Sequence, residues 1–122
     1  MTDIDKAPAR LNRFADLSFQ PRFAYPEMAD VVEVAGLADR SELSGGFARF
    51  RDADIPWQVQ YDELILVISG KFAVETPQGR LDAGPIDTIW LPAGTRVRYL
   101  AASALVFYSL QPASWVNAAT AA

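Results

Sequence analysis

Two stretches decide the fold of this chain, YDELILVISG at residues 61–70 and DTIWLPAG at residues 87–94. Each is a run rich in apolar and β-branched residues that stops at a glycine, and Pro92-Ala93-Gly94 is a strong turn signal. Residues 64–68 form a continuous apolar run, which predicts a strand buried on both faces. Both stretches therefore indicate strands joined by tight turns.

Segments of the same kind extend outward in both directions. We predict strands over residues 31–34, 46–51, 57–60, 64–68, 71–76, 87–91, 95–100 and 105–110. Turns or loops are predicted at residues 44–46, 52–56, 77–79 and 92–94. About seven or eight short strands, with turn signals roughly every 8–12 residues, are typical of an all-β sandwich or barrel.

The length of 122 residues fits a single domain. Residues 1–26 carry three prolines among scattered aromatics, which disfavours a helix and predicts an irregular N-terminal arm. The part from Phe19 to Phe23 either extends along a sheet or a partner subunit, or is a tail pinned by a few aromatic contacts. We assign residues 27–116 to the barrel and residues 117–122 to a flexible C-terminal tail.

The composition excludes several functions. The chain has no histidine and no cysteine, so Ser-His-Asp and Cys-His catalysis, zinc–thiolate sites and disulfides are all excluded. A net charge of −4 argues against nucleic acid as a partner. No apolar run approaches the roughly 20 residues that span a bilayer, and residues 1–10 lack the apolar core of a signal peptide. We expect a cytoplasmic protein that binds neither nucleic acid nor membrane.

Two motifs resemble those of a known superfamily. Glu63, followed after six residues by Gly70, is similar to the end of the first cupin motif, and Asp87 with the 92–94 turn is similar to the second. A longer series resembles the cupin domain of the ethanolamine-utilisation protein Q (EutQ-like) family. Its motifs lie at residues 45–47, 56–57, 61–63, 92–94, 107–108 and 111–115. The resemblance covers roughly residues 43–115 and implies an all-β fold, a single small cupin barrel (a double-stranded β-helix or jelly roll).

The chain departs from metal-binding cupins where those proteins carry three histidines. The first two positions fall on Pro56 and Gln58, or with the shorter spacing on Trp57 and Val59, and the third falls on Val97. Only Glu63 of the usual metal set remains, and the EutQ-like branch is similar in lacking these histidines. The resemblance therefore implies a barrel with no metal and no other cofactor.

Other cofactor sites find little support in the residues. Asp52, Asp54, Asp62 and Glu63 offer oxygen ligands for magnesium or calcium. The Asp-x-Asp segment, however, lacks the glycine and the downstream glutamate of an EF-hand, so we interpret residues 52–54 as an exposed loop. No phosphate-binding Gly-Lys-Ser/Thr loop and no dinucleotide fingerprint is present.

Glu63 is the first candidate catalytic residue, because the resemblance implies that it points into the barrel. Burial raises the pKa of a carboxyl group, which suits a general acid or base. The alternatives are a structural acid bonded to a Tyr, Trp or Arg, and a leftover metal ligand without a task. Tyr61 shares the face of Glu63 by strand alternation and is the second catalytic candidate, its alternative being aromatic packing. Asp62 faces the opposite way.

A further group of residues is predicted to bind a ligand at the pocket wall: Trp57, Gln58, Tyr99, Trp90 and Tyr108. Tyr99 has the parity of the third histidine position and so lies on the inner face. For Trp90 and Tyr108 the favoured alternative is packing in the core or at a dimer contact. Arg96 and Arg98 face outward, unless a bulge turns Arg98 into the barrel as an anion anchor.

Two function hypotheses follow. The first is a metal-free EutQ-like cupin that binds a small polar metabolite and acts on it by acid/base chemistry through Glu63, in small-carbon metabolism of the ethanolamine type. As an enzyme it would be of the isomerase or lyase type, or acetate-kinase-like as the resemblance implies, although no nucleotide motif supports a kinase. The second is a non-catalytic cupin module for protein assembly. The aromatic arm and the apolar strand predict a homodimer under either hypothesis.

Overall fold

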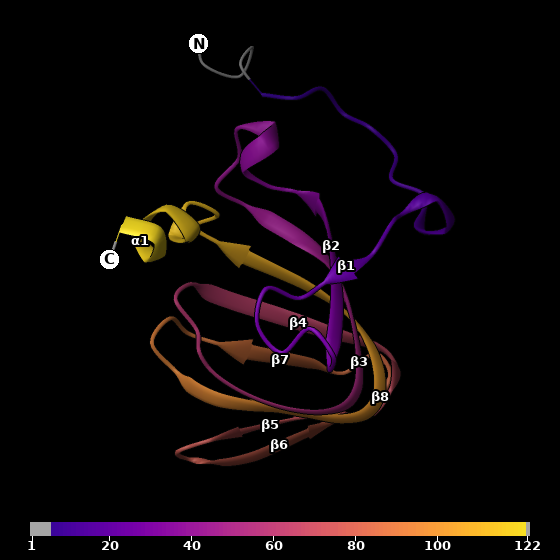
Figure 1. Cartoon of the computed structure of the whole chain (residues 1–122), viewed down its shortest axis with the longest axis vertical. Helices are drawn as coiled ribbons and strands as arrows, with labels where there is room; N and C mark the ends of the chain where they lie inside the picture. The colour runs from indigo at the N-terminus through magenta and orange to yellow at the C-terminus, as the bar shows by residue number, and fades with distance from the viewer. Residues whose placement is uncertain (1–5, 122) are drawn as a thin grey trace.

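The computed structural model describes residues 6–121, so the first five residues of the predicted arm and residue 122 of the predicted tail lie outside it. Eight strands are present (Figure 1). They are β1 (Gln20–Pro21), β2 (Ala29–Ala35), β3 (Ser44–Gln58), β4 (Asp62–Gly70), β5 (Phe72–Thr76), β6 (Gly79–Ala83), β7 (Thr88–Leu91) and β8 (Arg96–Gln111). Two 3-10 turns, η2 (Phe14–Asp16) and η3 (Leu37–Asp39), and one helix, α1 (Trp115–Ala121), complete the described elements. The all-β fold expected from the sequence is confirmed.

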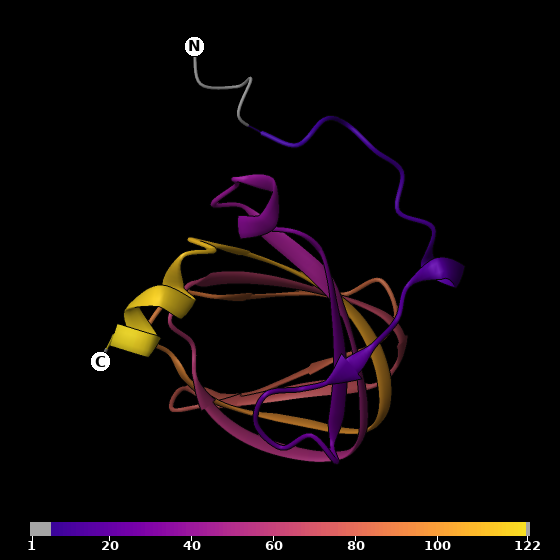
Figure 2. The same cartoon turned by 45° about the horizontal axis from the view of Figure 1, so that its top comes forward.

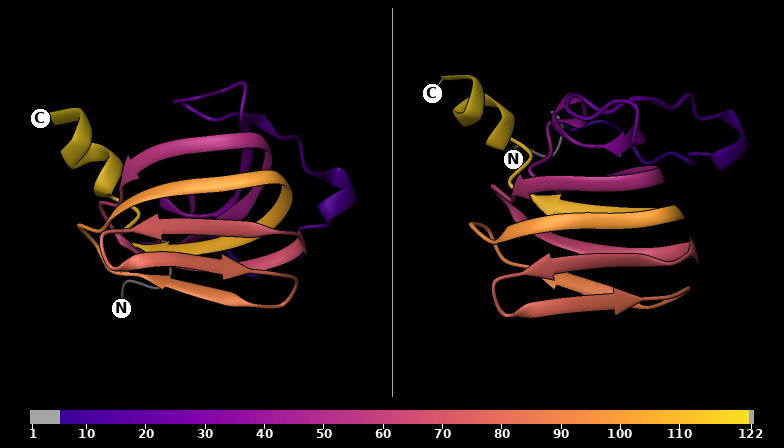
Figure 3. Two further views of the ribbon diagram at one scale, coloured as in Figure 1. Left: turned by 90° about the horizontal axis from the view of Figure 1, so that it is seen from below. Right: turned by 60° about the horizontal axis from the view of Figure 1, so that its bottom comes forward.

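The two long strands β3 and β8 form the frame of the molecule. They pair antiparallel from Ser44↔Leu110 to Gln58↔Arg96, and the pairing is interrupted at Asp52, whose φ is +42°. Beyond this point both strands bend round together, as Figures 1 and 2 show. The first half of the pair carries the order β1-β2-β3-β8-β4-β7, while the second half carries β5 on β8 and then β6 on β5. The result is a barrel of two facing layers (Figure 3).

Alternate residues of each strand supply the core. The largest fully buried side chains include Phe72, Ile55, Leu91 and Val67, which come from different strands of both layers. Phe72 packs against Phe50 with ring centroids 4.9 Å apart. Burial of this apolar surface, at roughly 25 cal/mol per Å² removed from water, is the main force that holds the two layers together.

Several predicted boundaries are wrong. Residues 44–46 and 52–56 were expected in turns and loops, and both segments belong to β3. Likewise, the predicted strands 95–100 and 105–110 are one strand, β8. Each break signal falls where a partner strand still pairs, so cross-strand hydrogen bonds override the local turn preference.

The run 64–68 is not buried on both faces. In β4 the side chains alternate, with Ile65 and Val67 buried while Leu64 is 47% exposed. Apolar residues on the outer side of the strand concealed the period of two that the strand follows. The prediction of a strand here is correct, and the prediction of its two buried faces is wrong.

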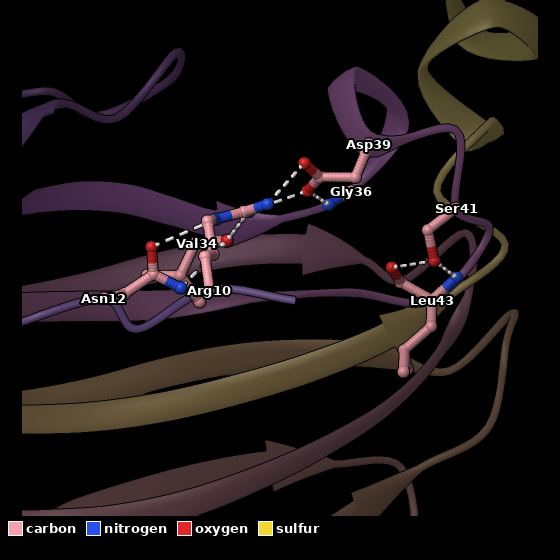
Figure 4. Close-up of polar contacts among 7 residues, drawn as sticks. All are labelled: Arg10, Asn12, Val34, Gly36, Asp39, Ser41 and Leu43. Atoms are coloured by element: carbon pink, nitrogen blue, oxygen red, sulfur yellow. Dashed lines mark hydrogen bonds and ion pairs between the residues drawn. The ribbon is translucent and has the colours of Figure 1, made fainter. Parts of the chain in front are cut away.

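The N-terminal arm is fastened to the barrel at several points. Arg10 forms a bidentate ion pair with Asp39 of η3, at 2.7 and 2.9 Å, and also donates to the carbonyl oxygen of Val34 (Figure 4). Further along, Phe14 packs edge-on against Phe47 of β3, at 5.1 Å. The arm then pairs with β2 through β1. The irregular arm expected from the prolines therefore lies along one edge of the sheet.

The C-terminal end differs from the expected tail. Residues 115–121 form α1, a short helix that begins directly after the barrel and lies beside its open side in Figure 2. The flexibility of residues 117–122 stays a prediction. Among the described residues, no helix is long and apolar enough to cross a membrane.

Candidate functional site

A cavity of about 410 Å³ opens into the barrel between its two layers. Its polar lining is concentrated in a few side chains: Arg22, Glu33, Ser44, Tyr61, Glu63, Tyr99 and Tyr108. Apolar side chains such as Phe50, Ile65 and Phe72 form the floor, and Phe23 and Trp115 stand at the rim. A largely apolar cavity with a few convergent polar groups is the usual form of a small-molecule site.

A second hollow of about 650 Å³ lies beside the β5–β6 hairpin. Its lining includes Lys71, Arg80 and Asp82, and Arg80 already donates a hydrogen bond to Asp82 at 2.9 Å. This hollow is more open and its charges are solvated. The cavity inside the barrel is therefore the better candidate for chemistry.

Glu63 lies deep in the barrel cavity. Alternation along β4 turns its side chain inward, and the residue is only 6% exposed. Tyr99 of β8 donates a hydrogen bond of 2.9 Å to Oε1. Oε2 makes no hydrogen bond to the described residues. Every fully buried side-chain oxygen of these residues has a hydrogen-bond partner, so Oε2 is not fully buried and is accessible from the cavity. One oxygen is thus fixed by the protein and the other faces the cavity.

The surroundings raise the pKa of Glu63 to about 7. The main cause is burial, which disfavours the carboxylate. The Tyr99 hydrogen bond and the positive charge of Arg22 act in the opposite direction and limit the rise. At neutral pH the carboxyl group is therefore close to its midpoint, where it can both give and take a proton.

Tyr61 lines the same cavity, but it does not contact Glu63 by a hydrogen bond. Its hydroxyl oxygen accepts a 3.1 Å hydrogen bond from the indole nitrogen of Trp57, and its ring lies 5.0 Å from that of Trp115. Burial and the nearby Glu63 raise the pKa of Tyr61, so it stays a neutral hydroxyl. The hydrogen bond to the Glu63 carboxyl group comes from Tyr99 instead.

The predicted wall residues divide into two groups. Tyr99 and Tyr108 line the cavity, and burial together with Glu33 and Glu63 raises the pKa of Tyr108 to about 12. Trp57 stands behind the rim, in edge contact with Phe23 and Trp115 at 5.3 and 6.0 Å. Whether these residues bind a ligand stays a prediction.

Gln58 and Trp90 do not line this cavity. Gln58 is exposed and donates to the carbonyl oxygen of Gly94 at 3.2 Å. In β7 the alternation turns Ile89 and Leu91 inward, so Trp90 points outward and is 57% exposed. The same period of two that turns Glu63 and Tyr99 inward excludes Trp90 from the barrel interior.

Arg22 is a cavity residue that was not predicted from the sequence. It follows β1 directly, in the arm, and is only 8% exposed. The local signal was weak, because a single arginine between Pro21 and Phe23 in a segment without periodicity reads as solvated. Only the three-dimensional path of the arm across the barrel brings Arg22 to the cavity.

The positions of the absent histidines offer no replacement metal ligands. Val97 is buried in the core, and Pro56 pairs across the sheet with Arg98. Asp54 is bound by Arg98 at 3.0 Å, and Asp62 accepts from the backbone amide of Ala93, so both carboxylates face outward. Among the described residues no group of three acidic side chains is placed to hold a metal ion.

The two-layer barrel has the cupin fold. The fold matches an RmlC-like cupin from Shewanella frigidimarina with a TM-score of 0.71 and 9% identity, over 88% of this chain and 94% of that one. Within that class, the chain belongs to the EutQ family, since the family described as ethanolamine utilisation protein EutQ matches residues 17–117.

Two further relatives carry the family name. An Escherichia coli K12 protein named acetate kinase EutQ is 27% identical over 113 residues, which cover 92% of this chain and 46% of that protein. A crystal structure described as ethanolamine utilization protein Q from Salmonella typhimurium LT2 has a TM-score of 0.77 and 23% identity, over 83% of this chain and 84% of that one. The chain thus spans about half the length of the curated relatives it matches.

Proposed function

We propose that this EutQ-family cupin binds a small polar metabolite in the barrel cavity without a metal, and that Glu63 moves a proton to or from it. The observation that carries the proposal is the placement of Glu63, whose Oε1 is held by Tyr99 while Oε2 faces the cavity. A general acid or base must lie within hydrogen-bond reach of the group it protonates, and a ligand in the cavity meets Oε2 directly.

The chemistry is proton transfer, of the kind that isomerases and lyases use. Tyr99 orients the carboxyl group, and the apolar floor excludes water, which strengthens the interactions of Glu63 with a bound ligand. The family link supports a role in small-carbon metabolism of the ethanolamine type, and we propose that the protein acts in the cytoplasm. The acetate kinase activity is named for relatives of which this chain covers less than half, and no nucleotide motif in this sequence supports a kinase, so the proposal is limited to proton transfer.

Thermal unfolding against a ligand panel tests the proposal. The panel contains small amines, hydroxy acids, acyl phosphates, sugars and divalent metal ions, and the proteins are the wild type and Glu63→Gln. A ligand at about 100 times its Kd stabilises the folded state by roughly 2.7 kcal/mol. At pH 8 we expect a shift whose size differs between wild type and Glu63→Gln, because only the wild type places a carboxylate beside the ligand. A shift that is equal in both proteins, or no shift at all, would count against it.

The outer surface favours one alternative, a module for assembly. Leu64 and Trp90 are register partners on the outside of β4 and β7, and both are about half-exposed. Exposed apolar patches of this kind mark protein contacts. If the panel produces no shift, while a protein other than a second copy of this chain binds this face, the assembly role is the better account.

A further inference from the structure

Arg22 is buried at the cavity in a way that fixes most of its side chain. Its Nη1 donates a 2.8 Å hydrogen bond to the carbonyl oxygen of Ala24. Its guanidinium carbon lies 4.4 Å from the ring centroid of Phe23 and 5.2 Å from that of Trp57. These aromatic contacts hold the guanidinium plane without supplying a negative charge.

No carboxylate of the described residues pairs with Arg22. The ion pairs of the structure involve other arginines. Glu63 is the carboxyl group whose charge influences Arg22, and it lies beyond ion-pair distance. Nε and Nη2 make no hydrogen bond to the described part of the chain. Every fully buried side-chain nitrogen of the described residues has a hydrogen-bond partner, so Nε and Nη2 are not fully buried. Because Arg22 lines the cavity, these two nitrogens are accessible there.

A buried guanidinium without a counter-ion is costly, because burial removes the water that solvates it. The cost is visible in the pKa of Arg22, which burial lowers from its usual value. Glu63 compensates only in part, since its own carboxyl group is half protonated near neutral pH. The cavity therefore holds a positive charge whose free donors, Nε and Nη2, are those that an oxyanion binds side by side.

We propose that the ligand of this cavity is a small organic anion, and that Arg22 binds its carboxylate or phosphate group while the rest of the molecule faces Oε2 of Glu63. The inference rests on the proposed function and narrows it to one class of ligand. It also gives the N-terminal arm a part in the site, because Arg22 follows β1 and reaches the cavity only while the arm pairs with β2.

The anion and Glu63 interact, and this gives the binding a pH dependence. The groups that face the cavity are Arg22, Glu33, Tyr61, Glu63, Tyr99 and Tyr108. The three tyrosines stay neutral, because burial raises each pKa, and Glu33 lies at the exposed edge, where Ser44 donates to it at 3.1 Å. The negative charge of an anion bound to Arg22 disfavours the carboxylate form of Glu63. The bound anion therefore keeps Glu63 protonated, and affinity falls as pH rises through about 7.

The test uses matched anionic and neutral probes on the full chain. Calorimetric titrations with acetate, glycolate, inorganic phosphate and methyl phosphate are compared with acetamide and ethylene glycol, at pH 6 and pH 8. The variants are Arg22→Gln, Arg22→Lys, Glu63→Gln and Arg49→Gln. Arg49 is the matched control, because it is an exposed arginine that also lies over an arm aromatic, 3.8 Å from the Phe19 ring centroid.

We expect at least one anion to bind the wild type, and its neutral counterpart not to bind. Arg22→Gln should weaken that binding about 10- to 100-fold, as the loss of a charge-assisted hydrogen bond predicts. Arg22→Lys should recover part of the affinity, and Arg49→Gln should equal the wild type. The carboxylate and phosphate arms decide which oxyanion the cavity prefers.

Three results would overturn the inference. These are no binding of any anion probe, equal binding to Arg22→Gln, and neutral probes that bind as tightly as the anions. If Arg22→Gln does not fold, Arg22→Met, whose apolar side chain fits between the same rings, replaces it. Anion binding that depends on Arg22 but is indifferent to Glu63→Gln and to pH would refute the proposed function of Glu63 while leaving Arg22 as an anion site. Loss of one proposal is thereby distinguished from loss of the other.

Discussion

The buried carboxyl group of Glu63 makes the free energy of unfolding depend on pH. Its pKa is about 7 in the folded protein, against the ordinary 4.5 of the unfolded chain. Between these values the folded state holds a proton that the unfolded state has released. Raising the pH through this window therefore destabilises the wild type, by about 3 kcal/mol in total. Chemical denaturation at pH 4 and pH 8 should show this loss, and Glu63→Gln should remove it.

Asp62→Asn is the control for this measurement. Asp62 is adjacent in sequence but exposed on the other face of β4. We expect this variant to keep the pH dependence of the wild type. A Glu63→Gln protein with the wild-type slope would show that Glu63 titrates normally in the folded state.

The hydrogen bond from Tyr99 lowers the pKa of Glu63 relative to the value that burial alone would give. Removing the hydroxyl in Tyr99→Phe deletes the donor that stabilises the carboxylate, so the pKa of Glu63 should rise further above 7. A side-chain carbon NMR titration of Glu63 measures this directly. Tyr61→Phe should leave the titration unchanged, because the Tyr61 hydroxyl contacts Trp57 instead. Equal shifts in both variants would contradict the assignment of the donor.

The carboxyl and hydroxyl groups of the cavity could be predicted from the sequence, whereas its positive charge, Arg22, could not. The cupin resemblance implied that Glu63 faces the barrel interior, and strand alternation, a local property, extended this correctly to Tyr61 and Tyr99. Alternation gave no information about Arg22, which reaches the cavity through the path of an arm without periodicity. Contacts between segments distant in sequence leave no local pattern, and this limit applies to both Arg22 and the Tyr99–Glu63 hydrogen bond.

Among the strands, β3 and β8 show where local signals mislead. The predicted loop at residues 52–56 contains two aspartates and a proline, yet Ala53 to Pro56 pair with residues 98–101. The strand bends at Asp52 rather than ending there. A bend and a loop use the same residues, and only the partner strand distinguishes them. The sequence predicts strands at β2, β3, β4, β5, β7 and β8 but neither β1 nor β6, and it divides β3 and β8 into two strands each.

Gly70 at the end of β4 is expected to be essential for the approach of β4 to β8. Its φ is +79°, and a Cβ there would meet the carbonyl oxygen of Ser103. Gly70→Ala should therefore destabilise the fold by about 2–4 kcal/mol, combining backbone strain with a backbone clash. Denaturant unfolding measures the loss.

Gly94→Ala is the matched comparison. Gly94 also has a positive φ, +92°, but open space surrounds its Cβ position. Gly94→Ala should therefore lower the free energy of unfolding only by the backbone strain, about 1–2 kcal/mol. Equal losses in the two variants would show that the contact with Ser103 is relieved without cost.

For the chain as a whole, the predicted homodimer is expected to form through the outer face of β4 and β7. Trp90 and Leu64 lie there as cross-strand neighbours, and a charge placed among them would have to be desolvated on association. Trp90→Glu should therefore give a monomer in sedimentation experiments. Leu81→Glu, on β6, which pairs with neither strand, should keep the dimer. A wild-type monomer, or a Trp90→Glu dimer, would exclude this face.

Tryptophan side chains at the rim of the cavity allow its entrance to be followed by intrinsic fluorescence. Two of the protein's three tryptophans, Trp57 and Trp115, stand together beside Phe23, and only Trp90 lies elsewhere. A Trp90→Phe variant would emit from the rim alone. Its spectrum and its quenching by iodide would then follow events at the entrance without any attached dye, so occupancy and the seating of the arm become readable in the same cuvette.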